Sequence, residues 1–447
     1  MKLENKNIRK QIIKLAWPAI LEMMLHTLVW TADTAMVGRL NPVAISSVNL
    51  SSQIMFTVSN ILGAFGIGAT AMVSRYIGSK DRQRAEEIAS QAVGFSILIG
   101  LSVGILGIFS TDTLFKWIVN DTEVINQGTM YLKIVYIGAI FLIPLMVGNA
   151  VLRGAGNTVI PLVAAAFANV FNIIGDYLLI FGKFGFPEMG VKGAAIATGS
   201  AQIVGALVTF FFLIRGKSGI KIDIVKIFVF KLESLKKLIK LSVPAIFEMF
   251  MNEGSRLVSS FWIAQLGTVA FAAHSLAVAA ESISFMPGLG FAIAATTLVG
   301  QNLGSENVEK AELSAKKSTE YGVFFMGLIG IVFFVFPFQI MRLFSTDLKT
   351  VGLAAQCIRV GAFEQIPMAL GMVMSGALKG AGDTRGPFKI SLITNLLVRM
   401  PLIFIVVFII KGHIAYVWAI TAFQFLVEGT LMTIRYKKGN WKKIKIE

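Results

Sequence analysis

Cysteine, histidine and charged residues are scarce in this chain. Only 15% of its 447 residues are charged, whereas soluble domains carry about a quarter. Cys357 is the single cysteine, so no disulfide can form within the chain. The three histidines, His26, His274 and His413, are far apart and match no HExxH zinc motif. A disulfide-stabilised fold and a zinc protease of that type are therefore excluded.

A nucleotide-binding loop is also missing. The tripeptide "GKS" at 216–218 resembles the end of such a loop, but Phe211 stands where the motif requires a glycine. The connections between the apolar runs are too short to hold a separate nucleotide-hydrolysing domain. We therefore expect that the chain is not an enzyme and that it uses no cofactor.

Long apolar runs make up most of the sequence. Hydrophobic residues make up 55% of the chain. Runs of roughly twenty residues recur from Trp17 onward, and each can cross a hydrocarbon core about 30 Å thick as a helix. The sequence predicts an all-α polytopic membrane protein. Its twelve transmembrane helices are expected near residues 12–38, 46–74, 88–110, 128–152, 158–181, 190–214, 238–265, 270–299, 318–340, 352–378, 385–410 and 413–435.

The positive charge is unevenly placed along the chain. The formal net charge is +16, and most lysines and arginines fall near the termini and in alternate loops. Because loops rich in Lys and Arg face the cytoplasm, we expect a multi-pass protein of the inner (plasma) membrane with both termini cytoplasmic. No basic helix interleaved with aromatic residues occurs in a soluble segment, so nucleic acid is not an expected partner. The lipid bilayer is an expected partner, and we expect the protein to be a monomer.

One basic, glycine-rich turn occurs twice. "RGAGNTVIP" begins at Arg153, and "KGAGDTRGP" begins 226 residues later at Lys379. The same offset aligns "WPAILEM" at 17–23 with "VPAIFEM" at 243–249 without a gap. Chance similarity between apolar helices would not preserve one register through the polar loops as well. The chain is therefore predicted to be a duplicated unit of six helices.

The duplication predicts how the chain is organised. An N-terminal six-helix bundle over 1–215 and a C-terminal bundle over 238–447 are joined by a basic cytoplasmic linker at 216–237. Six is an even number, so both copies insert the same way up. We expect them to be pseudo-symmetric about an axis along the membrane normal.

The repeated turn has a structural interpretation in both copies. Its glycines end one helix, and Asn157 or Thr158 in the first copy can cap the next helix. Pro161 then fits the first turn of that helix. Asp383, Thr384 and Pro387 occupy the matching positions of the second copy.

Ionisable residues inside the apolar runs are the candidate functional residues. Each costs roughly 2.5–3.5 kcal/mol at the centre of a membrane helix, so those that are kept usually have a function. The embedded bases are Arg256 and Arg399, and they are outnumbered by the acids. An acidic interior suits cations or protons, and pairing of glutamates with these arginines is the alternative. The embedded acids are Glu22, Asp33, Asp176, Glu248, Glu253, Glu281, Glu364 and Glu428.

Asp33 and Asp176 are the most informative of these acids. Asp33 lies nineteen residues after Lys14 and Asp176 eighteen after Thr158, where their helices enter the membrane, hence roughly 28 Å along each helix at 1.5 Å per residue. Asn172 shares the helix face of Asp176, and Thr198 on the next helix can reach the same level. Oxygen ligands of this kind suit Na⁺, and a close acid pair also suits a proton. Leu402 matches Asp176 in the second copy, so the acid pair belongs to the first half alone.

Glu22 and Glu248 match each other across the repeat. Each follows a proline, Pro18 or Pro244, by about one turn, so a helix bend is expected nearby. Two interpretations stay open for this pair of glutamates. One is a polar contact across the pseudo-symmetry axis, and the other is a role in transport.

Several stretches resemble one membrane protein family. They are "LAWPAILEMMLHTLVWTADTAMVGRL", "GATAMVSRYIGS", "VLRGAGNT", "ESISFMPGLGFAIAATTLVGQNLGS" and "ALKGAGDTRGPF". They are similar to segments of the multidrug and toxic compound extrusion (MATE) family, and the resemblance covers nearly the whole chain. It implies two six-helix bundles, alternating access, and efflux of organic cations or amphiphilic drugs in exchange for Na⁺ or H⁺.

The resemblance also implies site residues. Asp33, Asn172, Asp176 and Thr198 resemble the cation or proton site of the family's N-terminal bundle, with Asp33 and Asp176 as the Na⁺ ligands if sodium is the coupling ion. In the NorM branch, acids of the C-terminal bundle are implicated as well. Glu253 lies one residue from that branch's glutamate on helix seven. The further candidates for substrate or ion coupling in this half are Glu248, Glu253 and Glu281.

Other classes of membrane protein fit less well. A flippase for lipid-linked sugars also has duplicated bundles, but usually a more basic cavity. A major facilitator transporter would carry a GxxxDRxGRR loop, which "GSKDRQRAEE" at 78–87 does not match. An intramembrane enzyme would need a nucleophile paired with a base, and a channel would need a repeated filter segment. The sequence supports neither.

The charge asymmetry makes the orientation testable. A reporter inserted within Lys217–Lys231 should be cytoplasmic, and one inserted within Asp112–Asp121 should be external, because Lys- and Arg-rich loops stay inside. Alkaline phosphatase and green fluorescent protein fusions report the two locations with opposite signals. The reverse pattern would overturn the predicted orientation.

Overall fold

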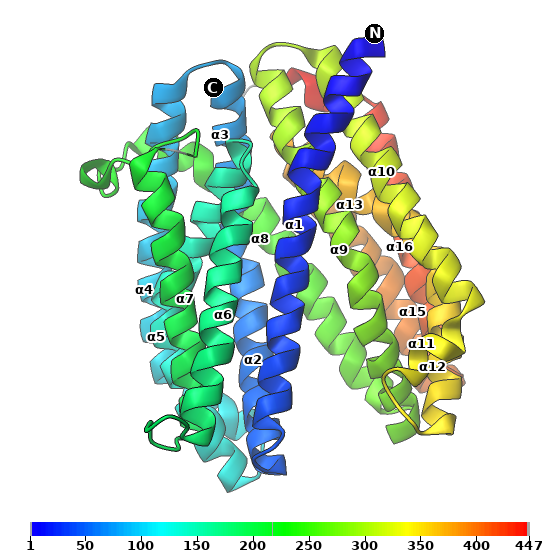
Figure 1. The fold of residues 1–447 in the computed structure, drawn as a ribbon. Helices are drawn as coiled ribbons and strands as arrows, with labels where there is room; N and C mark the ends of the chain where they lie inside the picture. The colour runs from blue at the N-terminus through cyan, green and yellow to red at the C-terminus, as the bar shows by residue number, and fades with distance from the viewer. Residues whose placement is uncertain (1, 217, 445–447) are drawn as a thin grey trace. The chain divides into compact units, whose positions relative to one another are not determined.

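A computed structural model describes residues 2–216 and 218–444, and within these ranges the chain is helical with no strand (Figure 1). The long helices are α1 (Lys2–Val37), α2 (Pro42–Gly63), α3 (Phe65–Gly78), α4 (Arg82–Ile118), α5 (Thr122–Gly154), α6 (Val159–Phe181), α7 (Val191–Arg215), α8 (Leu232–Ala264), α9 (Thr268–Gly304), α10 (Val308–Val335), α12 (Leu348–Gly361), α13 (Gln365–Gly380) and α16 (Ile414–Lys437). The shorter elements are η1 (Ile224–Lys226), α11 (Pro337–Arg342), η2 (Ala362–Glu364), α14 (Arg385–Ile393), η3 (Thr394–Arg399), α15 (Met400–Phe404), η4 (Ile405–Ile410) and η5 (Asn440–Lys443).

The expected twelve-helix pattern is present. Eleven segments of the described chain are long and apolar enough to cross a membrane. Three of them join several elements: Pro42–Gly78 holds α2 and α3, Leu348–Gly380 holds α12 to α13, and Arg385–Ile410 holds α14 to η4. The twelfth helix is α8, whose apolar stretch is interrupted by charged side chains. It corresponds to α1 at the 226-residue offset and likewise contains a proline, Pro244 for Pro18.

The helices form two compact units. One contains Leu21–Val73 and Asp81–Ile239, and the other contains Met1–Ile20, Ser74–Lys80 and Lys240–Glu447. We call them the first and the second unit. The predicted bundle limits, 1–215 and 238–447, stay a prediction about the repeat.

The same helix is central in both units. In the first unit α5 packs against α2, α4 and α7, and α6 packs against α7. In the second, α13 packs against α9, α10 and α16, and Figure 1 shows these four helices running side by side. At the repeat offset α13 is the counterpart of the last part of α5, so the two halves share one packing plan.

The repeated turn has the same hydrogen bonds in both copies. The amide of Asn157 donates to Leu152 O at 2.9 Å, and the amide of Asp383 donates to Leu378 O at 2.8 Å. The residue before each is a glycine in the left-handed region, with φ of 88° at Gly156 and 93° at Gly382. This is the Schellman geometry that ends a helix, and glycine adopts it without steric strain.

The side chain after this glycine caps the next helix, as predicted. Asn157 Oδ1 accepts from the amides of Val159 and Ile160 at 3.1 Å. Asp383 Oδ1 accepts from the amide of Gly386 at 3.0 Å. The alternative caps, Thr158 and Thr384, make no side-chain capping bond. The short polar side chain nearest the glycine is in reach of the free amides, so it takes the capping position.

A second pair of contacts repeats next to the turn. Thr70 Oγ1 donates to Ala150 O at 2.8 Å, and Thr296 Oγ1 donates to Gly376 O at 2.8 Å. A Cβ atom on Gly154 would lie 2.9 Å from Thr70 O. A Cβ atom on Gly380 would overlap Thr296 O. Glycine at these two positions lets the helices approach backbone to backbone.

The connection between the halves is docked on α4 by its backbone. The amides of Lys221, Asp223 and Lys231 donate to side-chain oxygens of α4, which belong to Glu86, Ser90 and Gln91. A Cβ atom on Gly94, one turn further on, would overlap the carbonyl of Ile227. The linker is therefore held against the first unit along one stripe of α4.

We expect Gly380→Ala to destabilise the protein, because the new methyl group has no room beside the Thr296 backbone. Overpacking of this kind costs about 1–3 kcal/mol. The apparent melting temperature of the purified protein in detergent should fall. Gly352→Ala is the matched control, because its Cβ meets nothing within 4 Å. An equal fall for both variants would contradict the close approach.

Candidate functional site

The structure brings Asp33 and Asp176 together. Asp33 lies on the last part of α1 and Asp176 on α6, and both belong to the first unit. Their carboxyl groups are within hydrogen-bonding reach of each other. Asp176 is fully buried, while Asp33 is partly buried. Two carboxylates share a hydrogen bond only when one of them carries a proton, so this contact is suited to holding a proton or a cation.

The oxygens of this acid pair have free bonding capacity. Asp33 Oδ1 and both carboxyl oxygens of Asp176 are buried and accept no hydrogen bond from any other donor group among the described residues. The same holds for both amide atoms of Asn172, which is 2% exposed and lies one turn before Asp176 on α6. A buried polar group without a partner is costly. Such a cluster is expected to acquire its partner from an ion, a proton or water.

Tyr131 on α5 lies near the acid pair and contacts Thr198 on α7. Its hydroxyl lies 3.5 Å from Thr198 Oγ1 and also reaches Ser52 on α2. It is close enough to Asp33 and Asp176 to experience their charges. All four residues predicted for this site therefore belong to one polar region of the first unit.

Tyr131 was not among the predicted site residues. It lies three residues after the predicted start of its helix at residue 128, at the end of the segment that faces away from the repeated turn. The depth argument that selected Asp33 applies to it as well. A tyrosine in an apolar run is common, whereas an embedded acid is costly, so the sequence alone does not single out Tyr131.

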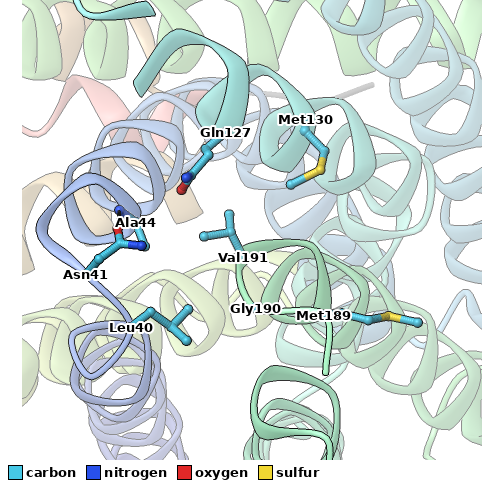
Figure 2. Close-up of a pocket in the computed structure, with 8 residues that line it drawn as sticks. All are labelled: Leu40, Asn41, Ala44, Gln127, Met130, Met189, Gly190 and Val191. Atoms are coloured by element: carbon cyan, nitrogen blue, oxygen red, sulfur yellow. Dashed lines mark hydrogen bonds between the residues drawn. The ribbon is translucent and has the colours of Figure 1, made fainter. Parts of the chain in front are cut away.

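A cavity of about 280 Å³ lies in the first unit, at the starts of α2 and α7 and beside the first turns of α5. Figure 2 shows the side chains of Asn41, Gln127 and Val191 around it. Gln127 lies one turn before Tyr131 on α5, and its Oε1 is buried with no partner among the described residues. Val191 lies two turns before Thr198 on α7. The cavity is thus one or two turns from the partners of the acid pair.

Glu22 and Glu248 form ion pairs inside their own repeats. Glu22 Oε1 accepts from Arg153 at 2.6 Å, and Glu248 Oε1 accepts from Lys379 at 2.8 Å. The Glu22 side chain is 1% exposed. Neither open interpretation, a contact across the symmetry axis or a role in transport, anticipated these partners. The basic residue of the repeated turn is thus engaged with a buried acid, besides its place in the charge pattern.

Glu428 and Glu253 differ in their surroundings. Glu428 accepts from Gln424 Nε2 at 2.5 Å and also contacts the hydroxyl of Thr394. Glu253 lies on α8, partly buried, five residues after Glu248. Glu428 is therefore hydrogen-bonded by neutral donors, and Arg399 interacts with it only electrostatically.

The second unit has an acid pair of its own. The side chains of Glu281 on α9 and Glu364 in η2 are in contact. Glu364 is fully buried, and neither of its carboxyl oxygens has a hydrogen-bonding partner among the described residues. Arg399 interacts electrostatically with both acids. Arg399 is therefore near this pair, but no ion pair or hydrogen bond between them is found among the described residues.

The helix that carries Arg399 departs from α-helical geometry twice. Residues Thr394–Arg399 and Ile405–Ile410 are π-helical. The counterpart in the first unit, α6, is α-helical throughout. Wide turns of this kind are frequent at functional sites. The segment around Arg399 thus differs from its repeat partner in backbone as well as in side chains.

Comparison with known proteins agrees with this architecture. The MatE family model matches the chain twice, at residues 18–178 and 244–405. The two matches start 226 residues apart and together cover most of the chain, which confirms the repeat. The chain belongs to the MatE family. This family and this fold are those of MATE membrane transporters.

Individual relatives support the same assignment. The "Probable multidrug resistance protein NorM" of Thermotoga maritima is 32% identical over 99% of this chain and 95% of its own length. The "Multidrug resistance protein MdtK" of Yersinia pseudotuberculosis is 26% identical over 88% of this chain and 86% of its own. A solved MOP superfamily transporter from Pyrococcus furiosus has the same fold. Its TM-score is 0.90 at 22% identity, over 98% of this chain and 97% of that one.

The ion pair between Glu22 and Arg153 should contribute strongly to the stability of this MATE protein. Removing one partner of a buried pair costs about 3–5 kcal/mol, because the remaining charge stays buried. Glu22→Ala and Arg153→Ala should each cost this much, and the double variant should cost less than their sum. Denaturant unfolding of the purified protein measures the three values.

A solvent-exposed pair in the same unit provides the control. Lys133 and Asp112 are 2.5 Å apart, with side chains 36% and 51% exposed. Alanine at either position should cost only about 0–1 kcal/mol. Additive losses at Glu22 and Arg153, or losses no larger than those of the exposed pair, would contradict the assigned role.

Proposed function

We propose that this MATE protein is a secondary active antiporter that exports organic cations or amphiphilic drugs in exchange for Na⁺ or H⁺. The observation that carries the proposal is the contact between Asp33 and Asp176, two buried carboxyl groups inside a membrane bundle. An embedded acid without a basic partner is expensive and commonly marks an ion pathway. The resistance proteins named above, which match along most of their length, support drugs as the substrates.

Coupling requires that the ion favour one conformation over the other. Two facing carboxylates repel each other strongly in a low-dielectric interior, and a shared proton or a bound cation removes that repulsion. Asp33 lies on α1 and Asp176 on α6, so the gain or loss of the ion changes the force between two helices. Charge movement adds to this, since one charge crossing 100 mV contributes about 2.3 kcal/mol.

The ligand set is compatible with either coupling ion. For a proton, Asp33 and Asp176 share it between their carboxyl oxygens. For Na⁺, the same oxygens with those of Asn172 and Thr198 would supply the hard ligands that such a cation prefers. Ethidium efflux from proteoliposomes under a Na⁺ gradient alone, then under a pH gradient alone, distinguishes the two ions. Efflux under neither gradient would contradict antiport.

The remaining parts of the proposal concern location and assembly. The protein acts as a monomer in the plasma membrane, with both termini in the cytoplasm, as the loop charges predict. An acidic interior disfavours a lipid-linked sugar, so a flippase is the outcome to test rather than the proposal. Flipping of a fluorescent glycolipid in the same proteoliposomes, without ethidium efflux, would support the flippase instead.

Asp33→Asn and Asp176→Asn should each abolish ion-driven ethidium efflux, because a neutral amide neither shares a proton in this way nor attracts a cation. The double variant should be little worse than either single one, since the two carboxyls act as a unit. Transport is measured in proteoliposomes with matched protein content, and folding is checked by the melting temperature.

Two controls make this test specific. Asp112→Asn removes an exposed aspartate of the same unit, and Glu428→Gln removes an embedded acid that is held by Gln424. Both variants should retain substantial efflux. If Asp176→Asn kept wild-type efflux, the coupling site would have to be placed in the second unit. Glu253 and Glu281 would then be the next candidates, with Glu364 in contact with Glu281.

A further inference from the structure

An apolar groove lies on the exposed surface of α6 and α7 in the first unit. Its volume is about 380 Å³. Leu207 is 63% exposed and Phe167 is 60% exposed, so the groove is open along its length. It is lined by Val163, Phe167, Leu207, Val208, Phe211 and Phe212. In a membrane-spanning bundle such a face meets lipid acyl chains.

A basic residue stands at the end of this groove. Arg215 is the last residue of α7, one turn after Phe211, and its guanidinium lies 4.2 Å from the centre of the Phe211 ring. The 25-residue helix α7 is about 37 Å long at 1.5 Å per residue, more than the roughly 30 Å of a hydrocarbon core. Its end therefore lies at the depth of the lipid headgroups.

A second basic residue lies beside Arg215. The chain turns back at Gly216, and the amide of Ile222 donates to Leu213 O at 3.0 Å. Ile220 and Ile222 are buried and Lys221 between them is exposed, so the lysine points outward. Its side-chain carbons lie within 3.6 Å of where a Cβ of Gly216 would be. Arg215 thus lies one turn beyond the groove residue Phe211, and the exposed Lys221 packs beside Gly216, the next residue.

An acid that contacts the backbone of Lys221 is already engaged. Glu86 on α4 accepts from Arg82 at 3.0 Å and from the backbone amide of Lys221 at 3.1 Å. The ion pairs found among the described residues include neither Arg215 nor Lys221. The positive charge at the end of α7 is therefore available to a ligand.

We propose that this groove binds one anionic phospholipid. An acyl chain lies along α6 and α7 between Phe167 and Leu207, and the phosphate is bound by Arg215 with Lys221 beside it. Guanidinium groups recognise phosphate through paired N–H donors, and the stacking on Phe211 orients this one. A zwitterionic lipid with the same chains fills the groove equally well but gains less from the two charges.

Native mass spectrometry of the intact protein tests the proposal. The detergent-purified protein is given equal amounts of phosphatidylglycerol and phosphatidylcholine with identical chains. The wild type should retain phosphatidylglycerol preferentially. Arg215→Gln should lower its retention about fivefold, because each basic residue near an anionic surface contributes about 1 kcal/mol. Adding Lys221→Gln should lower it further. Arg215→Lys should restore only part of it, because lysine keeps the charge but lacks the paired N–H donors.

A matched arginine elsewhere provides the control. Arg342 is the last residue of α11, and its guanidinium lies 4.9 Å from the ring centre of Phe338, which precedes it by one turn. It thus repeats the stacking of Arg215 without this groove. Arg342→Gln should leave the lipid preference unchanged. The groove itself is tested by Phe167→Ala with Leu207→Ala, which should weaken retention of both lipids.

Three results would overturn the proposal. The first is equal retention of the two lipids by the wild type, and the second is an equal loss in Arg342→Gln and Arg215→Gln. The third comes from glycerol phosphate, which has the headgroup charge without acyl chains. If it displaced phosphatidylglycerol at equal concentration, the groove would contribute nothing. None of these measurements depends on transport, so they are independent of the proposed antiport.

Discussion

A buried ion pair anchors the repeated turn in each half of the protein, and the surrounding contacts depend on it. The pair of Glu22 with Arg153 joins α1 to the end of α5. The pair of Glu248 with Lys379 joins α8 to the end of α13. In lipid, every polar group must find its partner inside the protein. The Schellman turn, the threonine contact to a backbone carbonyl and the ion pair meet this requirement together within a few residues. A glycine at 154 or 380 lets them meet.

On this shared frame the two halves carry different chemistry. The first unit has two aspartates in contact, with Tyr131 between them and Thr198. The second has a glutamate pair accompanied by Arg399, on a helix with two π-helical stretches. Duplication thus preserved the contacts that hold helices together and left the interior free to specialise.

The sequence was sufficient for the features that depend on periodicity and composition. Apolar run lengths predicted the helices, and a single offset predicted the repeat, its turn and its capping residues. Helix rise alone placed Asp33 and Asp176 at one level, and the structure brings them into contact. These predictions succeeded because each depends on local geometry or on matching copies.

Other features required knowledge of how helices pack. The partner of Glu22 lies 131 residues away, and nothing in either segment specifies which faces meet. Tyr131 is recognisable only once α5 is seen between α2 and α7. The π-helical turns leave no composition signal, since Thr394–Arg399 reads as an ordinary apolar helix interrupted by a single arginine. Facing partners and backbone irregularities are set by tertiary packing, which the pattern of one segment does not encode.

The way the linker is docked has a consequence for how this protein can diverge. Its polar contacts to Glu86, Ser90 and Gln91 come from backbone amides, which every residue except proline possesses. Selection for docking therefore acts on the stripe of α4 that receives those amides, and on Gly94, which leaves room for a carbonyl. Two linker side chains add contacts of their own, an ion pair of Lys231 with Glu87 and a ring contact of Phe230 with Phe95. The remaining linker positions can drift in sequence while the backbone contacts to α4 persist.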